Sequence, residues 1–320
     1  MSGIESLREA SGPSVAVEIA ADHVAVARVE TRGGSPIVQV HATEPLAPGV
    51  LVPSLNATNV QNRQAVSGAL ERVLERVGNP RRVGLVVPDL VAKVSLVRFE
   101  HVPARSADLE QLVRWQVRKT APFPIEEAQV SYQPGLKAAD GQEFIVSLAR
   151  RSVVEEYEGL CAAFGAHAGI VDLATFNVIN AALAGTAPSS DDWLLVHVAS
   201  DYASIAILRG ENLIFFRNRA TDSEGTLADV VHQAAMYYED RLQGAGFARA
   251  FLTGAASSNG RHAADAEELR RSLQERLQRP LEMVDASRAA TLTDRITVSP
   301  ALLDTLAPLV GLLLRGREAA

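Results

Sequence analysis

The amino-acid sequence predicts an α/β protein made of two similar lobes, with a small α/β module inserted in the first lobe. Three observations support this prediction: a repeated seven-residue pattern, the same order of strands and helix after each copy, and a segment of different character within the first half. The chain has 320 residues, of which 47% are hydrophobic, so it can bury a core large enough for two lobes.

The repeated pattern is Val-Glu-Ile-Ala-Ala-Asp-His at 17–23 and Val-His-Val-Ala-Ser-Asp-Tyr at 196–202. In each copy, alternating apolar residues flank a short turn, which predicts two strands joined by a hairpin. Asp22 and Asp201 suit these turns because an aspartate side chain can accept hydrogen bonds from the local backbone.

The elements after each hairpin also repeat. The predicted third strand, helix and fourth strand lie at 37–41, 61–77 and 82–87 in the first half, and at 213–217, 226–242 and 248–253 in the second. Two units with this order, about half a chain apart, predict two lobes of the same topology.

The inserted module is predicted at 91–150. Its expected elements are a strand at 94–99, a helix at 107–119, and strands at 129–133 and 143–149. Ser106 is expected to cap the helix, with Leu109, Leu112, Val113 and Val117 on its buried face and Pro122 and Pro124 preventing its continuation. We therefore divide the chain into a first lobe (1–90, with 151–190 and a C-terminal helix at 300–316), the module (91–150) and a second lobe (191–299).

Composition excludes several classes of protein. A net charge of −7 and a pI near 5.6 give no overall basic field, so no nucleic-acid partner is expected. Cys161 is the only cysteine and is expected to be buried, which excludes an internal disulfide and a cysteine-rich metal centre and favours a reducing cytoplasm. The sequence shows neither the apolar run of a signal peptide nor one of about 18 residues for a membrane span, so direct membrane insertion is not expected. The apolar run 302–314 contains Pro308 and Gly311 and is expected to pack against the first lobe rather than lie on a membrane.

Several short motifs, taken in order, resemble the PilM family of type IV pilus assembly proteins. They are Pro88-Asp89, Arg98, Val102-Pro103, Asp108-Leu109-Glu110, Arg114-Trp115, Ala121-Pro122-Phe123-Pro124 and a final apolar helix at 306–315. The resemblance extends from Val15 to Arg315. It implies an actin-like (ribonuclease H-like) duplicated fold, related to the cell-division protein FtsA, in which one ATP lies between the lobes.

The resemblance places the nucleotide site at both hairpin turns and at the loop after the fourth strand of the second lobe. The corresponding residues here are Glu18, Ala20, Ala21, Asp22, His197, Ala199, Ser200, Asp201, Thr253, Gly254 and Ala255. Glu18 and His197 stand where the family typically has aspartates, and alanines replace glycines that let backbone N–H groups approach phosphate. Histidine is also a poor partner for hydrated Mg²⁺, which favours oxygen ligands.

We therefore predict weak or absent binding of Mg·ATP, no catalytic residue, and a protein that is not an ATPase. An active actin-like ATP-binding protein stays open as the alternative, because Glu18, Ser200 and Thr253 still offer oxygen atoms. A sugar kinase is not favoured, since no motif for its catalytic aspartate is present.

The resemblance also implies a partner, an inner-membrane PilN-like protein whose cytoplasmic N-terminal peptide would bind in a groove between the first lobe and the module. The candidate residues for this contact are Arg114, Trp115, Arg118, Phe123 and Ile125. Trp115 falls off the apolar stripe of its helix and suits peptide anchoring, although Trp115 and Phe123 are also suited to completing the module's own core.

These expectations favour a cytoplasmic scaffold or adaptor of a type IV pilus, with a role in pilus assembly and twitching motility. It would be recruited to the inner face of the cytoplasmic membrane by its partners, which would include other pilus components and the motor ATPase. A cytoplasmic component of type II secretion resembling GspL is the alternative machine.

Overall fold

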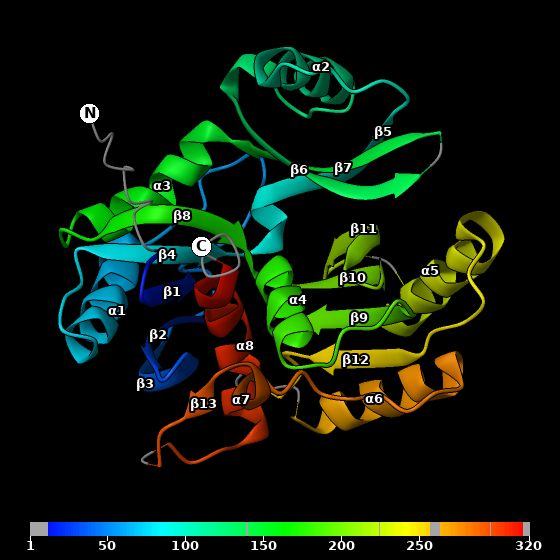
Figure 1. The fold of residues 1–320 in the computed structure, drawn as a ribbon. Coiled ribbons are helices and arrows are strands. Elements are labelled where there is room, and N and C mark those ends of the chain that lie inside the picture. The colour runs from blue at the N-terminus through cyan, green and yellow to red at the C-terminus, as the bar shows by residue number, and fades with distance from the viewer. Residues whose placement is uncertain (1–11, 139, 224, 257–262, 295, 316–320) are drawn as a thin grey trace, which may run out of the picture.

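The computed structural model describes residues 12–138, 140–223, 225–256, 263–294 and 296–315, which form three β-sheets and the helices that cover them (Figure 1). The first-lobe sheet lies at the left of Figure 1, the second-lobe sheet at the right, and the module's sheet above them. The fold is α/β, as the sequence predicts.

The first-lobe sheet has six strands. In spatial order they are β13 (Thr291–Leu292), β3 (Ser35–Pro45), β2 (His23–Arg32), β1 (Val15–Ile19), β4 (Arg82–Val87) and β8 (His167–Leu173). Strand β1 pairs antiparallel with β2 and parallel with β4, and β4 pairs parallel with β8.

The second-lobe sheet repeats the central part of this arrangement. Its order is β11 (Asn212–Ala220), β10 (Tyr202–Arg209), β9 (Asp192–Val198) and β12 (Arg249–Thr253), with β9 antiparallel to β10 and parallel to β12. The order β11-β10-β9-β12 therefore matches β3-β2-β1-β4, which confirms the predicted duplication.

The duplication extends to the backbone hydrogen bonds of the two turns. The amide of Ala20 donates to the carbonyl of His23 at 2.9 Å, and the amide of Ala199 donates to that of Tyr202 at 2.8 Å. Each turn aspartate also accepts a bond through its carbonyl from the residue after the third strand, Leu46 to Asp22 and Thr221 to Asp201. The two turns are therefore the same structure at the level of single bonds.

Helices cover the outer face of each lobe. They are α1 (Arg63–Arg76) and α3 (Arg151–Ala162) on the first lobe, and α5 (Leu227–Leu242) and α6 (Ala263–Leu277) on the second. The helices α1 and α5 begin at side-chain caps, in which Asn62 accepts from the amide of Ala65 and Thr226 from that of Asp229. Cys161 of α3 is fully buried, and burial raises the pKa of its thiol to about 12, so this cysteine is unreactive at neutral pH.

The space between the two lobe sheets is filled by α4 (Ala174–Ala184) and α8 (Pro300–Arg315), with the short α7 (Ala286–Ala289) beside them (Figure 1). One hydrophobic cluster joins residues of both sheets, among them Ala16 and Trp193, to these helices. The expected packing of the C-terminal apolar run is thus confirmed. Within the described residues, no helix is long and apolar enough to cross a membrane.

The module consists of a sheet ordered β5-β7-β6, one long helix and a short 3-10 turn. The elements are β5 (Ala92–Phe99), α2 (Ser106–Arg118), η2 (Ile125–Glu127), β6 (Ala128–Ala138) and β7 (Gly141–Arg150). Val113 and Val117 of α2 are buried against the sheet, and Leu109 and Leu112 are partly buried there, as predicted. The predicted cap at Ser106 is wrong, because α2 begins at Ser106 itself and Arg105 stands at the cap position without a side-chain bond.

Candidate functional site

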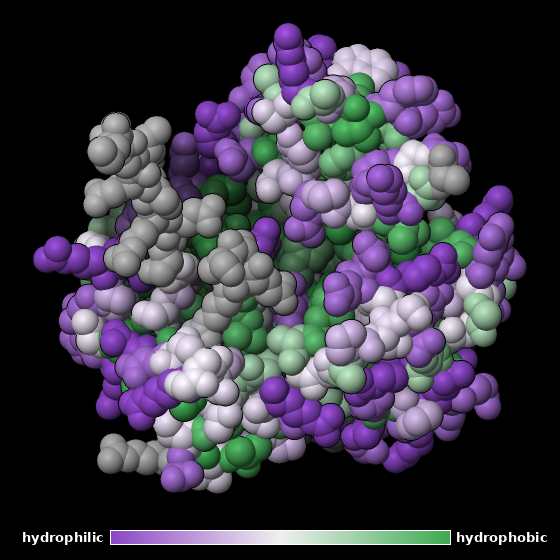
Figure 2. Space-filling model, viewed as in Figure 1, coloured by the Kyte–Doolittle hydropathy of each residue, from purple (hydrophilic) through white to green (hydrophobic). Residues whose placement is uncertain are grey.

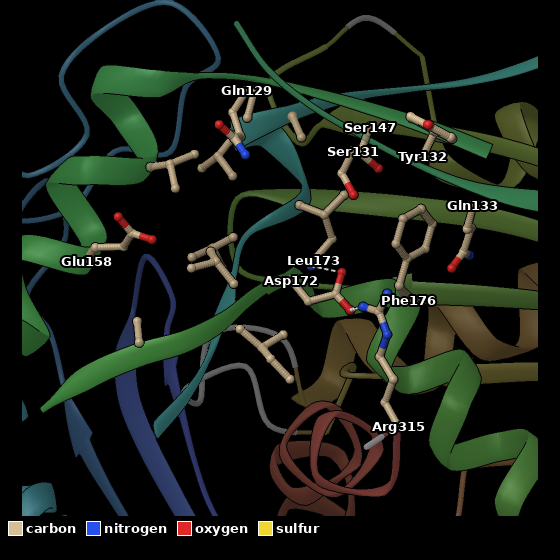
Figure 3. A pocket seen from close by; sticks show the side chains of 18 of the residues that line it. Gln129, Ser131, Tyr132, Gln133, Ser147, Glu158, Asp172, Leu173, Phe176 and Arg315 are labelled. Carbon is tan, nitrogen blue, oxygen red and sulfur yellow. Dashed lines mark hydrogen bonds and ion pairs between the residues drawn. The ribbon is translucent and has the colours of Figure 1, made fainter. Parts of the chain in front are cut away.

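A groove of about 730 Å³ lies between the module and the first lobe. Its walls come from β6 and β7 of the module, from β8, and from α3 and α4. Figure 2 shows hydrophobic residues at the bottom of a hollow below the module, and Figure 3 shows the groove from close by. Ligand pockets in proteins typically have volumes of about 300–1,000 Å³, so this groove is large enough for a peptide or small molecule.

The module contributes one face of its sheet to the groove. Ser131 on β6 is paired with Ser147 on β7, and both line the cavity (Figure 3). The intervening residues Val130, Val146 and Leu148 point to the opposite face, where they pack with α2. The groove and α2 therefore lie on opposite faces of the module's sheet.

This arrangement determines where the predicted partner residues lie. None of Arg114, Trp115, Arg118, Phe123 and Ile125 lines the groove. Phe123 and Ile125 are half-buried and pack in the module's own core. Trp115 is 59% exposed on the outer side of α2, with the ammonium of Lys119 5.5 Å from its ring centre. A partner contact at these five residues stays a prediction, and it would require a surface other than the groove.

The floor of the groove carries an ion pair. Arg315, the last described residue of α8, reaches Asp172 near the end of β8 (Figure 3). Burial raises the pKa of the Asp172 carboxyl, and the charge of Arg315 partly offsets this. Glu155 and Glu158 of α3 also line the groove, so its charged groups are mainly acidic.

The two hairpin turns face each other at a second, much smaller cavity. It has a volume of about 30 Å³, close to the volume that one water molecule takes up in the liquid, and Ala20, Asp22, Ala199, Ser200 and Gly254 are among its lining residues. Strand alternation directs Glu18 and His197, the residues before each turn, into this region, because the residues on either side of each pack on the outer faces of the lobes. Both positions predicted from the repeat are therefore brought together.

The first turn holds a buried cluster of charges. The Nδ1 atom of His23 lies 2.8 Å from Asp22, and its Nε2 atom lies 3.6 Å from Glu18. Burial alone would lower the pKa of His23, but the hydrogen bond with Asp22 and the charges of Glu18 and Asp22 outweigh burial and raise it to about 10. His23 is thus a cation at neutral pH and neutralises carboxylates that would otherwise be available to Mg²⁺.

The two turn aspartates differ in pKa. Burial tends to raise the pKa of Asp22, but the hydrogen bond and charge of His23 lower it overall. Burial raises the pKa of Asp201 to about 6, and the charges of Asp22 and Asp89 add to this shift. Ionised Asp201 therefore destabilises the fold: this cost is absent below about pH 4, grows between about pH 4 and pH 6, and is fully present above that range.

We expect Asp201→Asn to raise the free energy of unfolding at pH 7.5 by about 2 kcal/mol, with no gain at pH 4. Asp22→Asn should act in the opposite direction and lose about 1 kcal/mol at pH 7.5, because it removes the partner of His23. Urea unfolding at the two pH values measures both effects. An Asp201→Asn gain that is equal at both pH values would show that ionisation of Asp201 is not its cause.

A buried polar network joins the lobes behind the turns. The carboxylate of Asp89, in η1 (Asp89–Val91), is fully buried and accepts bonds from the amide and hydroxyl of Thr175 and from the hydroxyl of Ser204 on the second lobe. His197 lies 2.7 Å from the Thr175 hydroxyl, and since that hydroxyl donates to Asp89, Nδ1 of His197 donates to it. Burial lowers the pKa of His197, which keeps this imidazole neutral.

Hydrogen-bond donors of the loop after β12 are already bonded to a side chain of the protein itself. Asp304 of α8 accepts a bond of 2.8 Å from the Thr253 hydroxyl and one of 2.9 Å from the amide of Ala256. Gly254 has a φ of +83°, and a Cβ there would lie 3.0 Å from the carbonyl carbon of Val198 and even closer to its oxygen. This glycine allows the loop to pack directly on the strand before the second turn, and the loop therefore closes that side of the cavity.

The roles of Asp89 and Asp304 could not be predicted from the sequence. Asp89 is part of a motif of the resemblance, but its partners Thr175 and Ser204 are distant in sequence, and Asp304 lies in a helix that reads only as apolar. Among the described residues, no three His, Cys, Asp or Glu side chains are grouped so that they could hold a metal ion.

Two lobes of the same topology, facing each other through equivalent hairpin turns, define an actin-like protein. A solved structure described as an actin-like ATPase fold protein of unknown function from Bacteroides thetaiotaomicron matches with a TM-score of 0.50 at 11% identity, over 88% of this chain and 94% of that chain. The family model of the type IV pilus assembly protein PilM matches residues 16–246, more than half of the sequence. The chain belongs to the PilM family of type IV pilus assembly proteins.

A second solved structure, described as a PilM–PilN type IV pilus biogenesis complex, matches with a TM-score of 0.78 at 18% identity, over 95% of this chain and 98% of that chain. At this identity the likeness shows the fold alone. The cytoplasmic domain of EpsL from the type II secretion system of Vibrio cholerae matches with a TM-score of 0.46 at 13% identity, over 96% of this chain and 94% of that chain, which is too low to favour the secretion alternative.

Proposed function

We propose that this chain is a cytoplasmic adaptor of the type IV pilus machine and binds a cytoplasmic segment of a PilN-like inner-membrane protein in the groove between the module and the first lobe. The observation that carries this proposal is the groove itself, an open cavity of about 730 Å³. It is lined both by apolar side chains such as Phe176 and by hydrogen-bonding side chains such as Ser131 and Gln133. The structural relative described as a complex with PilN supports this choice of partner.

The charges of the groove suit such a partner. Cytoplasmic segments next to a membrane span carry an excess of Lys and Arg. Asp172 and Arg315 of the groove are paired with each other, which leaves the two carboxylates of Glu155 and Glu158 and the single cation of Arg151. A basic segment would therefore be attracted to the groove, and its binding would hold this chain at the inner face of the membrane. Other pilus components and the motor ATPase stay predicted partners.

We also propose that the cleft between the turns is a degenerate nucleotide site and that the chain is not an ATPase. A cavity of about 30 Å³ is roughly tenfold smaller than the lower limit of ordinary ligand pockets. His23 neutralises the carboxylates of the first turn, and Asp304 occupies the hydrogen-bond donors of the loop after β12. The residues present do not fit Mg·ATP in this arrangement, and binding would require the Asp89–Ser204 contact between the lobes to open.

The adaptor proposal predicts that a bulky side chain in the groove blocks the partner. Ser147→Trp should weaken binding of a synthetic peptide of the PilN-like protein's N-terminal segment, from the same organism, at least about 30-fold, because the indole would fill space that the peptide needs. Fluorescence anisotropy of the labelled peptide measures this effect. Ser67→Trp, on the half-exposed side of α1, is the matched control and should bind normally.

A third variant separates the two candidate surfaces. Trp115→Ala removes the exposed aromatic residue on the opposite face of the module's sheet. Loss of binding in Trp115→Ala with normal binding in Ser147→Trp would place the partner on α2 and contradict the groove proposal. Circular dichroism melting curves of all three variants establish that they fold.

A further inference from the structure

Edge strands carry unpaired backbone groups, and most proteins protect them with charged residues, prolines or very short length. In the part of the chain that the structure describes, the three sheets have six edge strands, and five of them are protected. Strand β5 carries Lys93 and Arg98, β6 carries Pro134 and Lys137, and β11 carries Arg217 and Arg219. Strand β13 is only two residues long.

The fifth protected edge is that of β12. It is covered by the chain near Glu282, whose amide donates to the carbonyl of Ala250 and whose carbonyl accepts from the amide of Leu252, both at 2.9 Å. Arg249 of β12 is also paired with Glu282 through its side chain. Backbone hydrogen bonds and an ion pair therefore both keep another strand from pairing with this edge.

Strand β8 is the exception. It ends the first-lobe sheet and reads His-Ala-Gly-Ile-Val-Asp-Leu, without lysine, arginine or proline. Its one carboxylate, Asp172, is paired with Arg315 from α8. The pairing with β4 has one register shift, at Gly169, and the amide of Leu173 donates to the Asp172 carboxylate; apart from these two features, nothing on this strand keeps another chain from pairing with its edge.

The groove lies along this unprotected edge. Six consecutive residues, 168–173, line the cavity, whereas β7 contributes alternate residues, Ile145, Ser147 and Ala149. Alternate residues indicate a wall made by the face of a sheet, and consecutive residues indicate a wall made by the edge of one. Ala168 and Gly169 are also small, so another backbone can approach closely at this end of β8.

We propose that the partner segment binds as an extended strand that pairs with the free edge of β8 and extends the first-lobe sheet by one strand. This inference rests on the proposed function and specifies how the groove is used. The backbone bonds to β8 would supply affinity, and alternate side chains would contact the face that carries Ser131 and Ser147. Strand β8 has seven residues and spans about 23 Å at about 3.3 Å per residue, which suits a segment of similar length. The occupant is thus a short extended peptide, neutral or basic, without proline at the paired positions.

Backbone N-methylation of the peptide tests this geometry while the protein stays unchanged. In an added strand, every second N–H donates to β8 and the others point away from it. A series of peptides of the PilN-like segment, each with one N-methyl group, should therefore alternate: binding falls about tenfold or more at every second position and changes little at the positions between. Because N-methylation has the same local steric effect at each residue, the intervening positions are the matched controls.

The possible outcomes distinguish the two proposals. Alternating losses support strand addition. If the unmodified peptide binds and Ser147→Trp blocks it, but losses do not alternate along the peptide, strand addition is overturned and the adaptor function stands. If the unmodified peptide does not bind at all, the proposed function is overturned, and this inference with it.

Discussion

Replacing Gly311 with alanine is expected to lower the free energy of unfolding by about 3 kcal/mol. Gly311 lies in α8 where this helix crosses α4, and a Cβ there would lie 2.6 Å from the carbonyl carbon of Asn177 and even closer to its oxygen. These atoms belong to backbone, so the conflict is relieved only by separating two helices that pack between both sheets. Urea unfolding followed by circular dichroism measures the loss.

Gly68 in α1 provides the matched control for this substitution. A Cβ at Gly68 would meet only a side-chain nitrogen of Arg72 at 3.5 Å, so alanine fits there without strain. Because alanine has the higher helix propensity, Gly68→Ala should stabilise the protein by up to about 1 kcal/mol. Equal effects at the two glycines would contradict the close crossing of α4 and α8.

The second large effect is expected at Asp89. Asp89→Ala should cost about 4 kcal/mol, since it leaves the amide and hydroxyl of Thr175 and the hydroxyl of Ser204 buried without their acceptor. The loss should occur at the contact between lobes, so hydrogen exchange should increase in both η1 and β10. Thermal and urea unfolding give the magnitude, and exchange mass spectrometry gives the location.

Two smaller changes test this interpretation of Asp89. Ser204→Ala removes one donor and leaves the carboxylate with its bonds from Thr175, so it should cost only about 1 kcal/mol. Asp89→Asn keeps the shape and one acceptor oxygen and should fall between the two alanine variants. A cost for Ser204→Ala as large as that for Asp89→Ala would mean that the network does not centre on Asp89.

The duplicated fold could be predicted from the sequence because its signals are local. The alternation around 17–23 and 196–202, the turn aspartates and the apolar period of α1 and α5 each specify one element, and the repeat specifies that both copies have the same topology. The close packing at Gly311 could not be predicted, since it depends on Asn177, which is distant in sequence.

The position of the groove relative to α2 could not be predicted from the sequence either. The sequence identifies the apolar side of α2, with Val113 and Val117, and the alternation of β7, but not which face of the sheet the helix covers. Both faces of β7 read as suitable for burial, because Ile145 and Val146 are adjacent and both are buried. The sequence therefore predicts the aromatic and basic residues of α2 near the groove, whereas in the structure they lie on the opposite side of the module's sheet.

The small cavity between the hairpin turns shows how much residue types alone indicate. Glu18, His197, Ala20 and Ala199 line a cavity of about 30 Å³, and the altered phosphate site that their residue types indicate stays a prediction. The groups that occupy this region, His23 and Asp304, have roles that depend on three-dimensional contacts and were not predicted. If no nucleotide binds between the turns, no ligand there can change how the two lobes are arranged. The affinity of the groove for its partner should then be the same with and without nucleotide.

The most direct test of this account is a calorimetric titration of the unmodified chain with the N-terminal peptide of the PilN-like protein, first without nucleotide and then with Mg·ATP in excess. We predict binding in both titrations, with dissociation constants that agree within about twofold, because a ligand that does not bind cannot change the affinity of another. Binding that requires Mg·ATP, or that Mg·ATP changes tenfold or more, would contradict the account.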